Sequence, residues 1–177
     1  MLPLVVGCAI QASYVQPALG EKILQGRFVL EFTQNMRRQR EQGKFLWVHS
    51  ARQTKLEIFS PFGQTQARLE IHPEEGAGAQ SVLYTQGQTP RYADNPETLI
   101  QQLLGFSLPV QTVTVWIEGQ PAATEPAKII RDQQGRITSI QQMDWVIDYQ
   151  PYAAAIPRQI NFRHTAKDLL LRLMIDS

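Results

Sequence analysis

Cysteine, histidine and net charge are all scarce in this chain of 177 residues. It contains one cysteine, and its 17 basic residues nearly balance 16 acidic ones. A single cysteine cannot form an intramolecular disulfide, and His49, His72 and His164 are too far apart to suggest a local metal-binding motif. The near-neutral charge provides no excess of positive charge for binding a nucleic-acid backbone. The sequence therefore predicts no redox or zinc site, no nucleic-acid partner, and no metal or cofactor.

The sequence motifs of common catalytic sites are also missing. The chain has no G-x-S-x-G elbow, and Gly76-Ala77-Gly78 lacks the remaining spacing of a phosphate-binding loop. The adjacent Glu74 and Glu75 would point to opposite sides of an extended segment, which makes them a poor acid and base pair. We therefore predict that the protein is not an enzyme.

No stretch approaches the roughly 20 apolar residues of a membrane-spanning helix. The short run Leu4-Val5-Val6-Gly7-Cys8 resembles the lipobox of bacterial lipoproteins, in which the cysteine becomes the lipidated N-terminus. Too few residues precede Cys8 for a secretory signal, so this interpretation needs a true start upstream of Met1. The alternative is an incidental or buried cysteine. We predict a signal-peptide remnant at residues 1–7, a lipidated tether at 8–22 and one folded domain at 23–177.

Alternation of apolar and polar residues dominates the rest of the chain and predicts short β-strands. The apolar positions of these segments are Phe28, Leu30 and Phe32; Phe45 and Trp47; Leu56 and Ile58; Ala67, Leu69 and Ile71; Val82 to Tyr84; Trp145, Ile147 and Tyr149; Ile160 and Phe162; and Leu169, Leu171, Leu173 and Ile175. We interpret the arginine-rich segment from Asn35 to Gly43 as a basic hairpin loop, and Asp132 to Gly135 as a turn. Nine or more short strands predict an antiparallel sheet that curls into a barrel or half-barrel.

Two segments interrupt the alternation with helical patterns. The first begins at Asn95-Pro96-Glu97, which offers an N-cap, an early proline and an acidic first turn, and it ends at Gly105. The second, from Pro109 to Glu118, is ambiguous, because its β-branched residues favour a strand whereas its apolar residues also fit one helix face. We favour a helix there.

The inward positions of the predicted sheet are unusually aromatic. Such residues either fill a solid core or line a cavity, because a small barrel can do both. A cavity with apolar walls and no charged partners would suit hydrocarbon chains. The residue pattern leaves both alternatives open.

Several short segments occur in the order typical of the LolB family of outer-membrane lipoproteins, and together they span most of residues 24–175. They are Gly26-Arg27-Phe28, Phe45-Leu46-Trp47, Ser60-Pro61-Phe62-Gly63, the segment from Leu103 to Val110, the segment from Trp116 to Pro121, the segment from Trp145 to Tyr149, and Pro157-Arg158-Gln159-Ile160. On these segments the chain resembles that family. The resemblance implies a mainly β fold with a helical lid (α+β), in which an unclosed antiparallel β-barrel of the LolA/LolB-like type encloses an apolar cavity.

The resemblance also implies two functional sites. The cavity would receive the acyl chains of a lipoprotein, and its expected lining is Phe28, Leu30, Phe32, Phe45, Trp47, Leu56, Ile58, Leu69, Leu103, Trp116, Trp145, Ile147, Tyr149 and Phe162. The second site is the loop Ser60-Pro61-Phe62-Gly63, whose residue types suit a type I turn with Phe62 near its tip. Family members carry an apolar residue in the matching loop that is thought to enter the bilayer. The alternative is that Phe62 folds back onto the barrel.

The function implied by the resemblance is that of an outer-membrane lipoprotein acceptor. It would take acylated lipoproteins from a lipoprotein-loaded, LolA-like periplasmic carrier and insert them into outer-membrane lipid without catalysis. The protein would be a monomer on the periplasmic face, anchored through Cys8. The alternatives are a soluble periplasmic lipoprotein carrier or other acyl-chain-binding protein, an enzyme acting on lipids, and a scaffold with a solid core. The arginines Arg37, Arg38 and Arg40 are a further candidate contact, for an acidic carrier surface.

Overall fold

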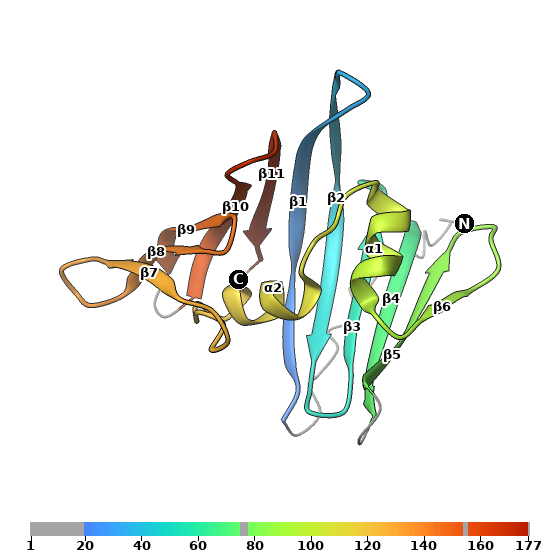
Figure 1. The fold of residues 1–177 in the computed structure, drawn as a ribbon, viewed down its shortest axis with the longest axis horizontal. Coiled ribbons are helices and arrows are strands. Elements are labelled where there is room, and N and C mark those ends of the chain that lie inside the picture. Colours follow the sequence, from blue (N-terminus) through green and yellow to red (C-terminus); the bar gives the residue numbers. More distant parts are fainter. Residues whose placement is uncertain (1–19, 75–77, 154–155, 177) are drawn as a thin grey trace, which may run out of the picture.

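The computed structural model describes residues 20–74, 78–153 and 156–176. In this part of the chain it contains eleven strands and two helices (Figure 1). In chain order they are β1 (Lys22–Gln34), β2 (Arg37–His49), β3 (Thr54–Phe59), β4 (Thr65–Glu74), β5 (Gly78–Thr85), β6 (Arg91–Ala93), α1 (Pro96–Leu104), α2 (Val110–Ile117), β7 (Ala127–Arg131), β8 (Ile137–Gln142), β9 (Trp145–Ala153), β10 (Ile156–His164) and β11 (Leu169–Ile175).

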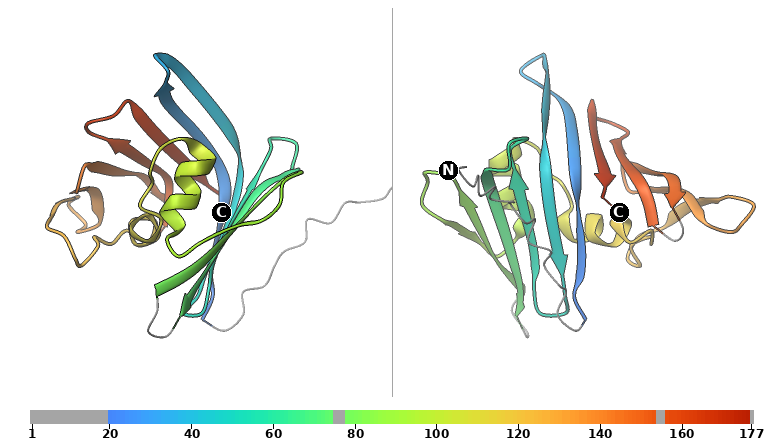
Figure 2. Two further views of the ribbon diagram at one scale, coloured as in Figure 1. Left: turned by 45° about the vertical axis from the view of Figure 1, so that its right-hand side comes forward. Right: turned by 180° about the vertical axis from the view of Figure 1, so that it is seen from behind.

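All strands belong to one antiparallel sheet with the order β6-β5-β4-β3-β2-β1-β11-β10-β9-β8-β7. The first and last strands, β1 and β11, pair from Gly26 to Phe32 of β1 and thereby join the two halves of the sheet. The sheet curves around the two helices, which lie on its concave side (Figures 1 and 2). Among the described residues, the edge strands β6 and β7 do not pair with each other. The predicted fold class, an unclosed antiparallel barrel with a helical lid, is confirmed.

Both predicted helices are present. In α1 the side chain of Asn95 accepts a hydrogen bond from the backbone N–H of Glu97 at 2.8 Å, and Pro96 occupies the first helical turn. Gly105 ends α1 with a φ of 79°, a left-handed conformation that glycine adopts without strain. The ambiguous second segment forms α2, because its apolar residues are buried on one helix face against the sheet. Burial therefore outweighs the strand propensity of its β-branched residues.

The interpretation of residues 35–43 as a basic hairpin loop is wrong. Only Asn35 and Met36 form the turn, and β2 begins at Arg37, because residues 37–43 pair in register with residues 28–34 of β1. This part of the hairpin projects beyond the rest of the sheet (Figure 1), and most of its residues in β2 are exposed. A strand with solvent on both faces does not need alternating apolar residues, so its sequence lacks the usual signal.

Two glycines allow backbones to approach closely in the curled sheet. A Cβ at Gly26 would collide with the carbonyl group of Met174 in β11. A Cβ at Gly43 would collide with the carbonyl oxygen of Phe59 and lie 2.9 Å from the ring of Phe28. Glycine therefore permits tight packing beside Phe28, on the concave face of the sheet.

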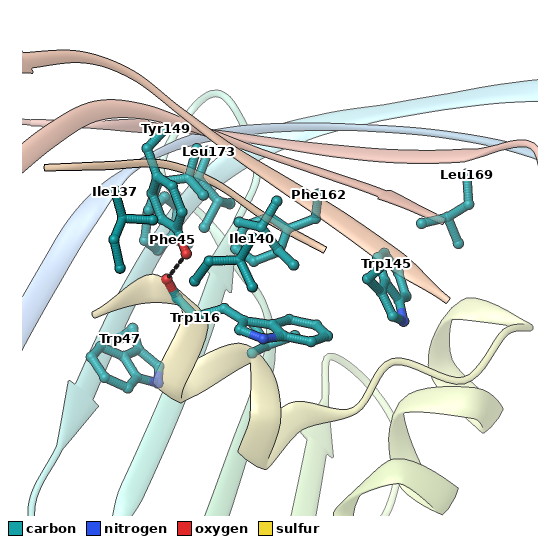
Figure 3. Packing of buried hydrophobic residues seen from close by; sticks show 13 residues of the cluster. Phe45, Trp47, Trp116, Ile137, Ile140, Trp145, Tyr149, Phe162, Leu169 and Leu173 are labelled. Carbon is teal, nitrogen blue, oxygen red and sulfur yellow. Dashed lines mark hydrogen bonds between the residues drawn. The ribbon is translucent and has the colours of Figure 1, made fainter. Parts of the chain in front are cut away.

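Buried apolar residues form two clusters. The larger cluster packs α2 against β8–β11 and against Phe45 and Trp47 of β2, and its centre is shown in Figure 3. The smaller cluster packs α1 and the start of α2 against β4 and β5. The space between the helices and strands β1–β5 is not filled by either cluster, and it forms the candidate site.

Candidate functional site

An apolar cavity of about 730 Å³ lies between the concave face of the sheet and the two helices. Strands β1–β5 and β11, both helices and the segment that connects them contribute its walls. Glu41 is the only charged side chain that lines it among the residues that the structure describes. Of the residues predicted to line a cavity, the structure brings together Phe28, Leu30, Phe32, Phe45, Trp47, Leu56, Ile58, Leu69 and Leu103.

The structure places the other five predicted lining residues in a packed core instead. Trp116, Trp145, Ile147, Tyr149 and Phe162 are each at most 3% exposed and belong to the larger buried cluster. The ring of Trp116 lies 6.2 Å from that of Trp145 and 6.5 Å from that of Phe162, centroid to centroid (Figure 3). The four residues on β9 and β10 face the concave side, as alternation predicts, but α2, which carries Trp116, covers that side and fills the space opposite them.

Hydrogen bonds within this core hold α2 and the segment after it in place. The side chain of Gln142 is 1% exposed, and its Oε1 accepts hydrogen bonds from Trp116 Nε1 at 2.8 Å and from the backbone N–H of Ala122 at 2.9 Å. Its Nε2 donates to the carbonyl oxygens of Ala122 at 2.7 Å and Glu125 at 2.6 Å. Tyr149 donates to the carbonyl oxygen of Trp116 at 2.7 Å (Figure 3). A buried amide whose partners are all supplied strongly favours one position of the segments that it joins.

The connection between α1 and α2 forms another wall of the cavity. The ring of Phe106 lies 5.5 Å from that of Phe32 in β1, centroid to centroid. Gly105 lies against the side-chain amide of Gln34. A Cβ atom at position 105 would lie only 2.5 Å from Nε2 of Gln34. Contacts of the connecting segment with the end of β1 therefore form this wall of the cavity.

Sequence reasoning missed several lining residues. Those on regular elements follow the same alternation or helical spacing that revealed their neighbours, and they are Ile71, Leu83, Ile100, Leu104, Val110, Val113, Ile117, Leu171 and Leu173. Phe106 and Leu108 lie in the connection between the helices, where no periodic pattern marks them. Phe59 also lines the cavity, although alternation from Ile58 predicts the opposite face. An irregularity in the pairing of β3 with β4 between Ile58 and Phe59 accounts for this difference.

The predicted loop Ser60-Pro61-Phe62-Gly63 connects β3 and β4. The N–H of Gly63 donates to the carbonyl oxygen of Ser60 at 2.9 Å, and Gly63 has a φ of 88° while Phe62 has no positive φ, as in a type I turn followed by a glycine. The backbone N–H of Gln64 donates to Oγ of Ser60 at 3.2 Å, which braces the turn. The side chain of Phe62 is 92% exposed, whereas the preceding Pro61 reaches the cavity wall.

The described residues offer no arrangement that points to a different kind of site. They contain no group of three or more His, Cys, Asp and Glu side chains that could hold a metal ion. Nor do they include a helix long and apolar enough to span a membrane. Burial and the nearby charge of Lys167 lower the pKa of His164, but His164 does not line the cavity. Cys8 lies outside the described residues. The geometry is that of an apolar binding cavity beside an exposed apolar loop.

Comparison with known proteins agrees with this geometry. Residues 24–177 match the family model described as "Outer membrane lipoprotein LolB". The chain is 36% identical over 156 residues to the outer-membrane lipoprotein LolB of Cupriavidus necator, covering 85% of this chain and 77% of the relative. It is 32% identical over 177 residues to that of Thiobacillus denitrificans, covering 97% of this chain and 89% of the relative. The chain therefore belongs to the outer-membrane lipoprotein LolB family.

Proposed function

We propose that this protein accepts acylated lipoproteins from a periplasmic carrier into its cavity and passes them to the outer membrane without a chemical step. Its membership in the LolB family gives it an outer-membrane location and a role in lipoprotein localisation. The observation that carries the finer proposal is the open apolar cavity, whose walls contain one charged side chain among the described residues. Such walls suit acyl chains.

The energetics of acyl chains explain why a cavity is needed. Each CH₂ group that leaves an apolar environment for water costs about 0.8 kcal/mol, so exposing whole chains would cost tens of kcal/mol. The chain has no nucleotide-binding motif through which hydrolysis would drive transfer. Direction then comes from successive affinities, with tighter binding here than in the carrier and more favourable partition into the bilayer than here.

The anchor in this proposal is Cys8. Lipidation there, with residues 8–22 as the tether, would hold the folded domain of residues 23–177 beside the bilayer, because two or more acyl chains give stable attachment. A soluble carrier of similar architecture would have no such lipid. Mass spectrometry of the N-terminus of the mature protein distinguishes the two, since only the anchored protein carries acyl groups on this cysteine.

Phe62 is assigned the role of entering the bilayer during transfer. Its side chain is almost fully exposed, although burial of a phenylalanine is worth about 1.5–3 kcal/mol. The residues just before it, from Phe59 to Pro61, line the cavity. An apolar tip that enters the headgroup region would therefore bring one end of the cavity to the membrane.

The test follows acylated cargo between three partners. The full chain with Cys8→Ala is mixed with a lipoprotein-loaded periplasmic carrier, and liposomes are added afterwards. We expect the cargo to move to this protein and then to the liposomes. Cargo that stays on the carrier, while circular dichroism shows this protein to be folded, would contradict the proposed function.

A further inference from the structure

The β1–β2 hairpin ends in a second exposed apolar tip. The side chain of Met36 is 98% exposed, and Asn35 and Met36 have φ values of 51° and 58°. Two central residues with positive φ indicate a type I′ turn, for which Asn-Gly is the preferred pair. Methionine in the second position is strained and buries nothing within the chain. Strain combined with full exposure of an apolar side chain suggests a contact outside the folded chain.

Positive charge surrounds this tip. Arg37, Arg38 and Arg40 follow Met36 directly, and the side chains of Arg38 and Arg40 are 70% and 61% exposed. Glu31 partly balances them, because its carboxylate lies 2.8 Å from Arg38 and 4.0 Å from Arg40. Arg37 has no ion pair among the residues that the structure describes. An apolar tip flanked by cations is suited to the headgroup region of an anionic bilayer.

The tip also lies on the same side of the cavity as Phe62. Gln34 and Glu41, near the tip of the β1–β2 hairpin, line the cavity, as do Phe59 to Pro61 next to Phe62. The β1–β2 and β3–β4 turns lie at the same end of the sheet (Figures 1 and 2). One contact with a flat surface leaves the tilt of a molecule undefined, whereas two separate contacts at the same end of the sheet restrict it.

We propose that Met36, with Arg37 and Arg40, forms a second membrane contact that binds anionic phospholipid headgroups. Together with Phe62 it orients the protein so that the end of the cavity between the two tips faces the bilayer. This inference rests on the proposed function, in which Phe62 meets the same bilayer. The charge of the tip and its position at the same end of the sheet as Phe62 favour a lipid surface over a protein partner.

A third exposed tip provides a matched control. Met143, in the turn between β8 and β9, is 54% exposed and also has a positive φ, of 53°. Neither Met143 nor the residues next to it line the cavity. A label at position 143 therefore shows the response of an exposed, strained turn that lies away from the proposed membrane face.

The experiment relies on the chain having a single cysteine, Cys8, which can be replaced. In full chains with Cys8→Ala, the changes Met36→Cys, Phe62→Cys and Met143→Cys each introduce one thiol for a polarity-sensitive fluorophore. The probes are phosphatidylcholine vesicles with and without phosphatidylglycerol. We expect the emission to brighten and shift to the blue at positions 36 and 62 on the anionic vesicles, and to stay unchanged at position 143.

A charge variant tests the arginines separately. Arg37→Gln with Arg40→Gln is expected to weaken binding to the anionic vesicles about fivefold per arginine and to leave binding to neutral vesicles unchanged. Arg38 is kept so that Glu31 retains its nearest partner. Equal binding of this variant and its parent to anionic vesicles would contradict the proposal.

The label positions separate the possible failures. A response at position 62 without one at position 36 overturns the second contact and leaves the proposed function standing. A response at position 36 to the unloaded carrier, without a response to vesicles, assigns the tip to a protein partner and overturns the lipid contact. Silence at both positions, with folding shown by circular dichroism, overturns the second contact and the bilayer role assigned to Phe62.

Discussion

The two halves of the curled sheet share the same alternation of residues, but their inward side chains form a packed core in one half and a cavity wall in the other. Around β8–β11 the inward side chains meet α2 and form a solid core. Trp116 of α2 donates a buried hydrogen bond to Gln142 and accepts one from Tyr149, and these bonds fix the helix. Around β1–β5 the inward side chains meet open space beneath α1 and the connecting segment. Arg91 in β6 donates a side-chain hydrogen bond to Gln102 in α1, but this bond is exposed and 3.5 Å long. One half therefore holds its helix in a fixed position, and the other half leaves room for a ligand.

The largest expected difference between the halves is in stability. Trp116→Ala removes a fully buried ring from the solid half, so we expect the free energy of unfolding to fall by about 3–5 kcal/mol. Urea denaturation followed by circular dichroism measures this loss. Leu103→Ala is the control, because this side chain faces the cavity and its removal opens less new space. An equal loss for both variants would remove the distinction between the halves.

The second-largest effect on stability is expected from the buried side-chain amide of Gln142. Gln142→Leu leaves the N–H groups of Trp116 and Ala122 without their acceptor, which we expect to cost about 2–3 kcal/mol. Hydrogen exchange should become faster in α2 than in α1. Gln141→Leu is the matched control, because the neighbouring Gln141 is exposed. Unchanged exchange in α2 would show that apolar packing alone holds the helix.

At the membrane face, Phe62→Glu should slow the delivery of cargo to liposomes. Loss of a phenylalanine contact worth about 1.5–3 kcal/mol predicts a rate roughly ten- to a hundredfold lower. Folding and capture from the carrier should be unchanged, because Phe62 is almost fully exposed and buries little area in the chain. Phe62→Leu retains an apolar tip and should retain most of the rate. Normal delivery by Phe62→Glu would defeat the assignment of this loop.

Filling the cavity should reduce binding without loss of stability. Leu103→Trp replaces an aliphatic side chain with a larger indole ring that occupies part of the cavity. We therefore expect a several-fold lower affinity for a fluorescent fatty acid and little change in urea denaturation. Leu103→Met keeps the volume and should bind as the parent does. Undiminished binding by the tryptophan variant would place the acyl chains elsewhere.

The smallest expected effect is a dependence of stability on pH through His164, which lies in the half with the packed core. Burial lowers the pKa of His164 below its ordinary value of 6.5, so the unfolded chain takes up this proton more readily than the folded chain. Stability should therefore fall as the pH drops below about 7, and it should not depend on this residue at higher pH. Urea denaturation of His164→Gln across this range should show a weaker acid loss than the parent. Identical pH profiles would contradict the assignment.

Much of the secondary structure could be predicted because its signals are local. The N-cap at Asn95 and the stop at Gly105 mark α1 within a few residues, and alternation marks the inward face of each long strand. The short strand β6 and the polar half of the β1–β2 hairpin carry no such signal. Backbone pairing stabilises both of them, with β5 in the first case and with β1 in the second.

The sequence by itself determined the fold class, the family and the side chains that face inward. Only the tertiary structure decided that Trp116, Tyr149 and Phe162 form a packed core while Phe28 and Leu56 line a cavity. It also decided that the segment at Val110–Ile117 is a helix, and that Phe59 turns toward the cavity. The physical reason is that alternation fixes the direction of a side chain within its own strand. What occupies the space across from it depends on the position of another segment, which no local pattern encodes.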